Sequence, residues 1–168
     1  MKLIRPETVT DSILQSSTVA ETDEAEWASG TTYADGDLVM VTGTGGGAAT
    51  ATHKIYESQA GSNTGNDPTT DDGTYWTEVS STNRFKMFDS IVQDQTTKAG
   101  GFNVVLQSPN VINSIGLINV DTASITVQVD DATEGTVYNE TFNMISDSGI
   151  NDWYAYFFEP IVRDDRLA

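Results

Sequence analysis

The sequence contains no cysteine and a single histidine, and these absences remove several kinds of chemistry. Without cysteine there are no disulfides, thiolate nucleophiles or thiolate metal ligands. One histidine, His53, is too few for most zinc sites, and no acid or nucleophile stands at a motif spacing from it, as a catalytic triad would require. The sequence therefore predicts a protein that is not an enzyme and that needs no metal or other cofactor.

Basic residues are also scarce. Eight Lys and Arg stand against 25 Asp and Glu in 168 residues, which gives a net charge of −17. So few cations cannot neutralise a phosphate backbone, and we expect no nucleic-acid partner. The same acidity disfavours an anionic membrane surface, and no apolar run reaches the length of a membrane span, so we expect no membrane insertion. The N-terminus also lacks the apolar core of a signal peptide.

Two patterns resemble functional motifs without the context that those motifs need. Residues 43–48 (GTGGGA) formally match a dinucleotide fingerprint, but no amphipathic helix follows to receive a pyrophosphate. The carboxylate pairs Asp71-Asp72 and Asp130-Asp131 stand in turn-like sequence, where neighbouring side chains point apart. We interpret these pairs as solvated turns. A calcium ion held by a loop stays an open alternative, without EF-hand spacing to support it.

The first 26 residues mix spaced aliphatic side chains with Ser and Thr and keep no helical period. One interpretation is a frayed terminus. The aliphatic content favours the other, an extended arm that lies on another protein. We predict an assembly arm over residues 1–26, followed by two folded parts. Its expected contact residues are Leu3, Ile4, Ile13 and Leu14.

Residues 27–79 predict a small three-stranded β module, with strands at 38–41, 54–57 and 75–79 and turn-forming residues between them. Aliphatic residues are few here, so aromatic rings must do much of the packing. The rings either form the core of the module, which we favour, or stack on a sugar ring, with at most one available to a ligand. The candidate glycan-stacking residues are Trp27, Tyr33, Tyr56 and Trp76.

Residues 80–168 carry the clearest alternation of apolar and polar side chains, after one or two expected helical turns at 85–92. The alternation predicts a jelly-roll-like β-sandwich, in an all-β protein. The expected strands are 102–107, 110–120, 123–130, 136–145 and 153–158. The last strand is apolar on both faces, so we expect an interface at Tyr154, Tyr156 and Phe158.

Several stretches together resemble a known family. The order Trp, Tyr, Gly-Asp, Val, Tyr, Pro, Trp is similar to small chitin- and cellulose-binding modules. Across nearly the whole chain, the sequence resembles tail proteins of long-tailed bacteriophages. The stretches that carry this second resemblance are IRPETVTDSILQSSTV (4–19), EWASGTTYADGDLV (26–39), HKIYES (53–58), YWTEV (75–79), TNRFKMFD (82–89) and WYAYFFEPI (153–161).

The resemblance implies a structural protein of the virion, near the tail tip or baseplate, made in the cytoplasm of the host bacterium. It also implies other tail proteins and further copies of this chain as partners, and cell-surface polysaccharide as a candidate ligand. Two alternatives stay open. One is an accessory carbohydrate-binding module of a polysaccharide-active protein, and the other is a capsid decoration or head–tail joining protein.

Overall fold

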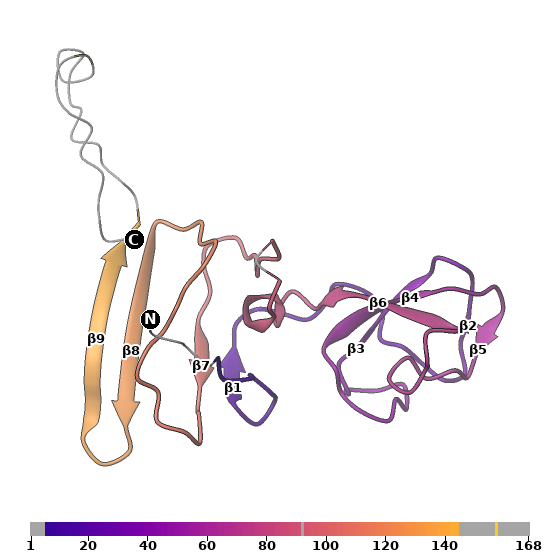
Figure 1. The fold of residues 1–168 in the computed structure, drawn as a ribbon, viewed down its shortest axis with the longest axis horizontal. Coiled ribbons are helices and arrows are strands. Elements are labelled where there is room, and N and C mark those ends of the chain that lie inside the picture. The colour runs from indigo at the N-terminus through magenta and orange to yellow at the C-terminus, as the bar shows by residue number, and fades with distance from the viewer. Residues whose placement is uncertain (1–5, 92, 145–156, 158–168) are drawn as a thin grey trace, which may run out of the picture. The chain divides into compact units, whose positions relative to one another are not determined.

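The computed structural model describes residues 6–91, 93–144 and 157, and nearly all of their regular structure is β-strand (Figure 1). The prediction of an all-β fold is confirmed for these residues. The short helical element η1 is a 3-10 turn inside the stretch where helical turns were expected. In chain order the elements are β1 (Leu14–Ser17), β2 (Thr32–Tyr33), β3 (Leu38–Val41), β4 (Lys54–Ser58), β5 (Asn63–Thr64), β6 (Trp76–Ser81), η1 (Lys86–Phe88), β7 (Val104–Leu106), β8 (Ser124–Asp131) and β9 (Gly135–Asn143).

The chain divides into two compact units, residues 1–119 and residues 120–168. The boundaries expected after residues 26 and 79 both lie inside the first unit. The first unit holds β1 to β7, and the described part of the second unit holds β8 and β9.

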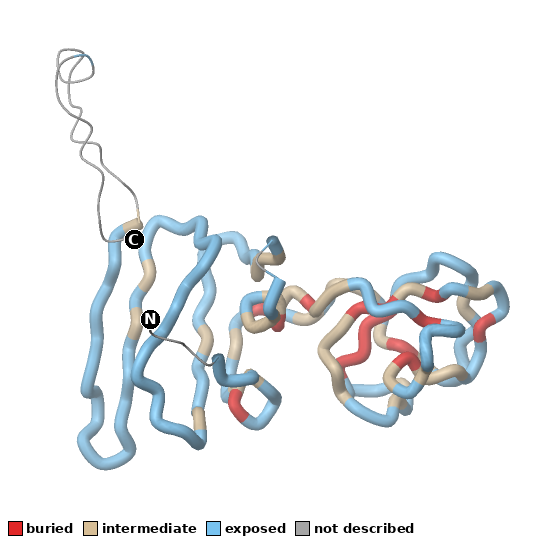
Figure 2. The backbone as a smooth tube through the Cα atoms, viewed as in Figure 1, coloured by how far each residue is buried: buried red, intermediate tan, exposed pale blue. Residues whose placement is uncertain are grey.

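Within the first unit, residues 27–81 form the best-packed region. Strand β4 is the centre of an antiparallel sheet, with β3 on one side and β6 on the other, and β2 pairs with β5 beside it. Buried residues gather in this region (red in Figure 2). The core consists of Trp27, Val39, Val41, Tyr56 and Trp76.

The turn before β3 contains Asp35, Gly36 and Asp37, residue types that favour turns. Gly36 has φ +84°, a left-handed conformation that glycine adopts without steric cost. The carboxylate of Asp37 accepts a hydrogen bond from the Ala34 N–H at 2.6 Å, and the Asp37 N–H donates to the Ala34 carbonyl. This local bonding fixes where β3 begins.

The N-terminal segment packs on its own chain. Strand β1 pairs antiparallel with β7, and Ile13 and Val19 are buried. This corrects the expectation that Ile13 is kept free for a neighbouring protein. The physical reason is that β7 offers an open strand edge and an apolar surface close by, so the segment completes a sheet within this chain.

The C-terminal half contains less sheet than its pattern predicts. Strands β7, β8 and β9 lie where strands were expected, but no strand forms at 110–120. Apolar and β-branched residues favour a strand only when a partner strand is available, and no strand among the described residues pairs with this stretch. The described part of 80–168 therefore does not contain the two packed sheets of a jelly roll. The predicted strand at 153–158 lies outside the described residues, apart from Phe157, which has a helical conformation and not that of a strand.

Candidate functional site

The two tryptophans proposed for sugar stacking lie inside the protein. Trp27 is 2% exposed and Trp76 is 3% exposed. The Trp76 indole N–H donates to the Asn66 carbonyl at 2.8 Å, which satisfies its polar atom internally. Tyr33 stands edge-on to Trp76, with ring centroids 5.2 Å apart. A sugar ring has no access to either indole face.

The other two rings belong to the same packing. Tyr56 is buried in the core, and half-buried Tyr33 packs against that core. The stacking alternative for these residues is therefore corrected, and the packing alternative holds. The reason is the one noted from the sequence, that the segment has too few aliphatic side chains to fill its interior without the rings.

A different group of side chains stands out beside this core, where charges are buried. The carboxylate of Glu21 is 7% exposed and lies 3.1 Å from the Arg84 guanidinium. It also accepts the hydroxyl hydrogen of Thr82 at 2.6 Å. Arg84 in turn donates from Nε to the Val19 carbonyl at 2.8 Å. These contacts tie residues 19–21 to the segment that follows β6.

His53 joins the same group between two carboxylates. Its Nδ1 is 2.8 Å from Glu21 Oε1, and its Nε2 is 2.8 Å from Asp11 Oδ1. The imidazole stacks on the ring of Phe85, with centroids 4.0 Å apart. His53 also has φ +53°, which is uncommon for a residue other than glycine and is a conformation that the surroundings must hold in place.

The surroundings shift the pKa values of this pair in opposite directions. Burial alone would lower the pKa of His53, but its hydrogen bond to Glu21, the close approach of the Asp11 carboxylate to Nε2 and the negative charges of both carboxylates outweigh it and raise the pKa. Burial alone would raise the pKa of Glu21. Hydrogen bonds from His53 and Thr82, and then the charges of His53 and Arg84, outweigh it and lower the pKa.

Sequence reasoning missed this cluster and interpreted His53 as an isolated residue. Glu21 and His53 are 32 positions apart, and Glu21 and Thr82 are 61 apart. No motif has these spacings. The only local signal is the acidic run ETDEAE at residues 21–26, and that run does not say which carboxylate is buried.

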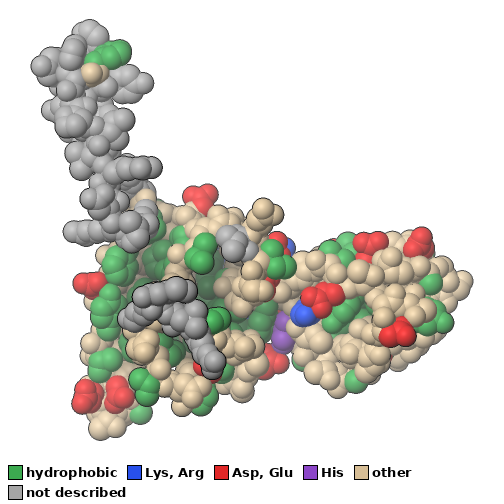
Figure 3. Space-filling model, viewed as in Figure 1, with side chains coloured by type: hydrophobic (Ala, Val, Ile, Leu, Met, Phe, Trp, Pro, Cys, Tyr) green, Lys and Arg blue, Asp and Glu red, His purple; other side chains and the backbone are tan. Residues whose placement is uncertain are grey.

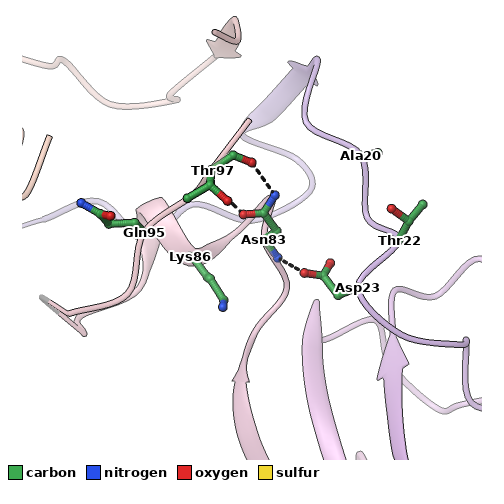
Figure 4. Close-up of a pocket in the computed structure, with 7 residues that line it drawn as sticks. All are labelled: Ala20, Thr22, Asp23, Asn83, Lys86, Gln95 and Thr97. Carbon is green, nitrogen blue, oxygen red and sulfur yellow. Dashed lines mark hydrogen bonds between the residues drawn. The ribbon is translucent and has the colours of Figure 1, made fainter. Parts of the chain in front are cut away.

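A polar cavity of about 420 Å³ lies nearby, lined by residues from three parts of the first unit (Figure 4). The Asn83 side chain bonds both backbone groups of Thr97, and its own backbone N–H donates to Asp23. The Asn83 amide is thereby occupied within the protein and unavailable to a ligand. The lining residues are Ala20, Thr22, Asp23, Asn83, Lys86, Gln95 and Thr97.

Exposed apolar residues form a third feature, between β7 and β8. Val111 is 95% exposed, and residues 111–120 expose a run of large aliphatic side chains. Large contiguous apolar surfaces mark interaction sites in many proteins, so these exposed side chains are candidates for contact with a partner. The run consists of Val111, Ile112, Ile115, Leu117, Ile118 and Val120.

The β8–β9 hairpin in the second unit also exposes apolar side chains. Its register places Ile125 opposite Phe142 and Val129 opposite Tyr138 on one face, whereas polar pairs such as Thr126 and Thr141 occupy the other. No described residue of this unit is buried (Figure 2), and hydrophobic side chains are visible along the hairpin in Figure 3. A two-stranded hairpin is marginally stable alone, so its apolar face needs a cover.

The residues predicted to mediate assembly are not the apolar residues that the structure exposes. Ile13 is buried and Leu14 is half-buried, both next to β7. Leu3, Ile4, Tyr154, Tyr156 and Phe158 lie outside the described residues. The residues that the structure exposes for contact, 111–120 and the face of β8–β9, were interpreted from sequence as parts of a closed sandwich.

No family model, curated protein or solved structure matches this chain. Among the residues that the structure describes, no helix has the length and hydropathy to cross a bilayer. Within the same residues, no group of three or more His, Cys, Asp or Glu side chains is arranged so that it could hold a metal ion.

Proposed function

We propose that this chain is a non-enzymatic structural protein of a bacteriophage tail, at the distal tail or baseplate, that assembles with copies of itself and with neighbouring tail proteins. Two separate observations carry the assembly role: the exposed apolar side chains at residues 111–120, and the β8–β9 hairpin, in which no side chain is fully buried. The resemblance of the sequence to tail proteins supports the proposed location in a phage tail.

The exposed strands support a specific form of assembly. Strand β9 is nine residues long and contains neither Lys nor Pro, the residues that commonly protect a free strand edge from pairing. Among the described residues no further strand pairs with β9, and an edge of this length beside an apolar face favours pairing with a strand of a neighbouring subunit. In this proposal the predicted jelly-roll-like sandwich is completed by neighbouring subunits in the virion.

Residues 27–79 are proposed to form a module like the small carbohydrate-binding domains, displayed toward glycan on the host surface. Because Trp27, Tyr56 and Trp76 are buried, a glycan would contact the outer surface of this module and not those rings. Binding of the full-length protein to host cell-wall polysaccharide tests this part separately from assembly. A substitution on the outer surface of the module that abolishes polysaccharide binding but leaves the fold intact would identify a residue that contacts the glycan.

Assembly is tested by the sedimentation of full-length protein and by antibody labelling of virions in the electron microscope. We expect oligomers in solution and label at the distal end of the tail. Replacing Ile118 by Ser should weaken the oligomer, whereas Ile91→Ser, at an exposed isoleucine outside the stretch, should not. A strictly monomeric protein would contradict the assembly role, and label on the capsid or at the head–tail joint would favour a decoration or joining protein.

A further inference from the structure

The contacts around His53 join parts of the chain that are far apart in sequence. Asp11 and Glu21 come from the N-terminal segment, His53 immediately precedes β4, and Arg84 follows β6. The contacts of Asp11 and of Glu21 with His53 hold residues 11–21 against residues 27–81. Other bonds to the segment, such as Arg84 Nε to the Val19 carbonyl, do not depend on the charge of His53.

We propose that Asp11, His53 and Glu21 form a pH-sensitive clasp, which holds the N-terminal segment against residues 27–81 when His53 is protonated and loosens as the pH rises. With the imidazolium in place, one cation lies between two carboxylates at 2.8 Å from each. When the proton leaves, one ring nitrogen no longer donates, and two carboxylates face a neutral ring.

The charged groups around His53 determine whether the folded protein favours the protonated or the neutral imidazole. Asp11 and Glu21 face it from the N-terminal segment and favour the proton. Arg84 shares Glu21 and offsets part of that attraction, and the Lys54 ammonium is held by Glu78 at 2.6 Å. Phe85 is neutral and packs on the ring face.

The stabilising contribution of His53 is fully present below its ordinary pKa of 6.5 and is lost as the pH rises through the raised pKa of the folded state. Glu21 sets the acidic limit. Its pKa is lowered from 4.5, so its contribution is present above 4.5 and is lost as the pH falls through the lower value. The clasp is closed at pH values between the lowered pKa of Glu21 and the raised pKa of His53. Starting from neutral pH, it opens as the pH rises through the pKa of His53.

The sequence makes this transition unusually easy to isolate. The chain has one histidine and no cysteine, so between about pH 6 and 9 only His53 and the N-terminal amine are expected to change charge at ordinary pKa values. A titration in this range therefore reports on His53 with few competing groups.

Amide hydrogen exchange on the full-length protein tests the clasp, with exchange corrected for its intrinsic pH dependence. We expect the protection of residues 13–19 to fall severalfold between pH 6 and 8.5, while β4 stays protected as the internal reference. The imidazole resonances should give His53 a pKa above that of an exposed histidine. A pKa at or below the exposed value, or pH-independent protection of 13–19, would overturn the proposal.

Two variants separate the clasp from a purely structural role. Asp11 is 63% exposed, so Asp11→Asn should fold normally while lowering the pKa of His53 and moving the loss of protection to lower pH. His53→Asn keeps a side chain that tolerates positive φ but does not titrate, and should make the protection of 13–19 independent of pH. Unchanged pH dependence in Asp11→Asn would count against the clasp even if His53→Asn failed to fold.

Discussion

At the scale of single residues, Trp76 shows how much one ring contributes to the region that contains it. It is 3% exposed, so Trp76→Ala removes a large buried ring and should cost about 3–5 kcal/mol of the free energy of unfolding. Its neighbour Tyr75 is 39% exposed, and Tyr75→Ala should change stability by about 0.5 kcal/mol or less. Urea denaturation of both variants checks this, and equal losses would contradict the buried position of Trp76.

Gly46 gives a second prediction at this scale, because both its conformation and its surroundings exclude a side chain. Its φ is +72°, and a Cβ atom would lie 1.6 Å from the Trp27 carbonyl oxygen. Gly46→Ala should therefore destabilise the protein by more than about 1 kcal/mol. Gly61 has open space around it, and Gly61→Ala should be neutral or gain about 0.4–1 kcal/mol. Thermal unfolding distinguishes the two variants, and a neutral Gly46→Ala would contradict this close approach.

At the scale of elements, the pairing of β1 with β7 makes the N-terminal segment part of the folded chain. Val19 is 2% exposed, so Val19→Ala should cost about 2 kcal/mol through lost burial and a small cavity. Val111→Ala makes the same chemical change at a side chain that is 95% exposed, and should leave the stability of the isolated chain nearly unchanged. Chemical denaturation below the association concentration gives both values. Equal, small effects would favour an arm that does not complete its own sheet.

At the scale of the whole molecule, charge opposes the association that the apolar surfaces favour. Copies that each carry −17 repel one another, and the range of that repulsion falls to about 10 Å at 0.1 M salt. Self-association should therefore strengthen as NaCl rises from low to moderate concentration, as measured by sedimentation. Ile118→Ser should remain weaker than the unaltered protein at every salt concentration. Association that weakens with added salt would indicate contacts made by ion pairs instead.

Local patterns in the sequence were enough to locate most strands. The alternation of Ile125, Val127 and Val129 with polar neighbours predicted β8, and the Asp-Gly turn before β3 forms where expected. These features depend on residues a few positions apart, so they can be seen without knowing the fold. Composition likewise argues against nucleic-acid binding and thiol chemistry, because the counts of charged residues and of cysteine are the same in any fold.

Only the tertiary structure decided which faces are covered. Whether Trp76 offers its ring to a sugar depends on Tyr33 and Asn66, and the environment of His53 depends on Asp11 and Glu21. The stretch at 110–120 has the residues of a strand but no partner among the described strands. Burial, pKa shifts and strand pairing are properties of neighbours in space, and a sequence lists only neighbours along the chain.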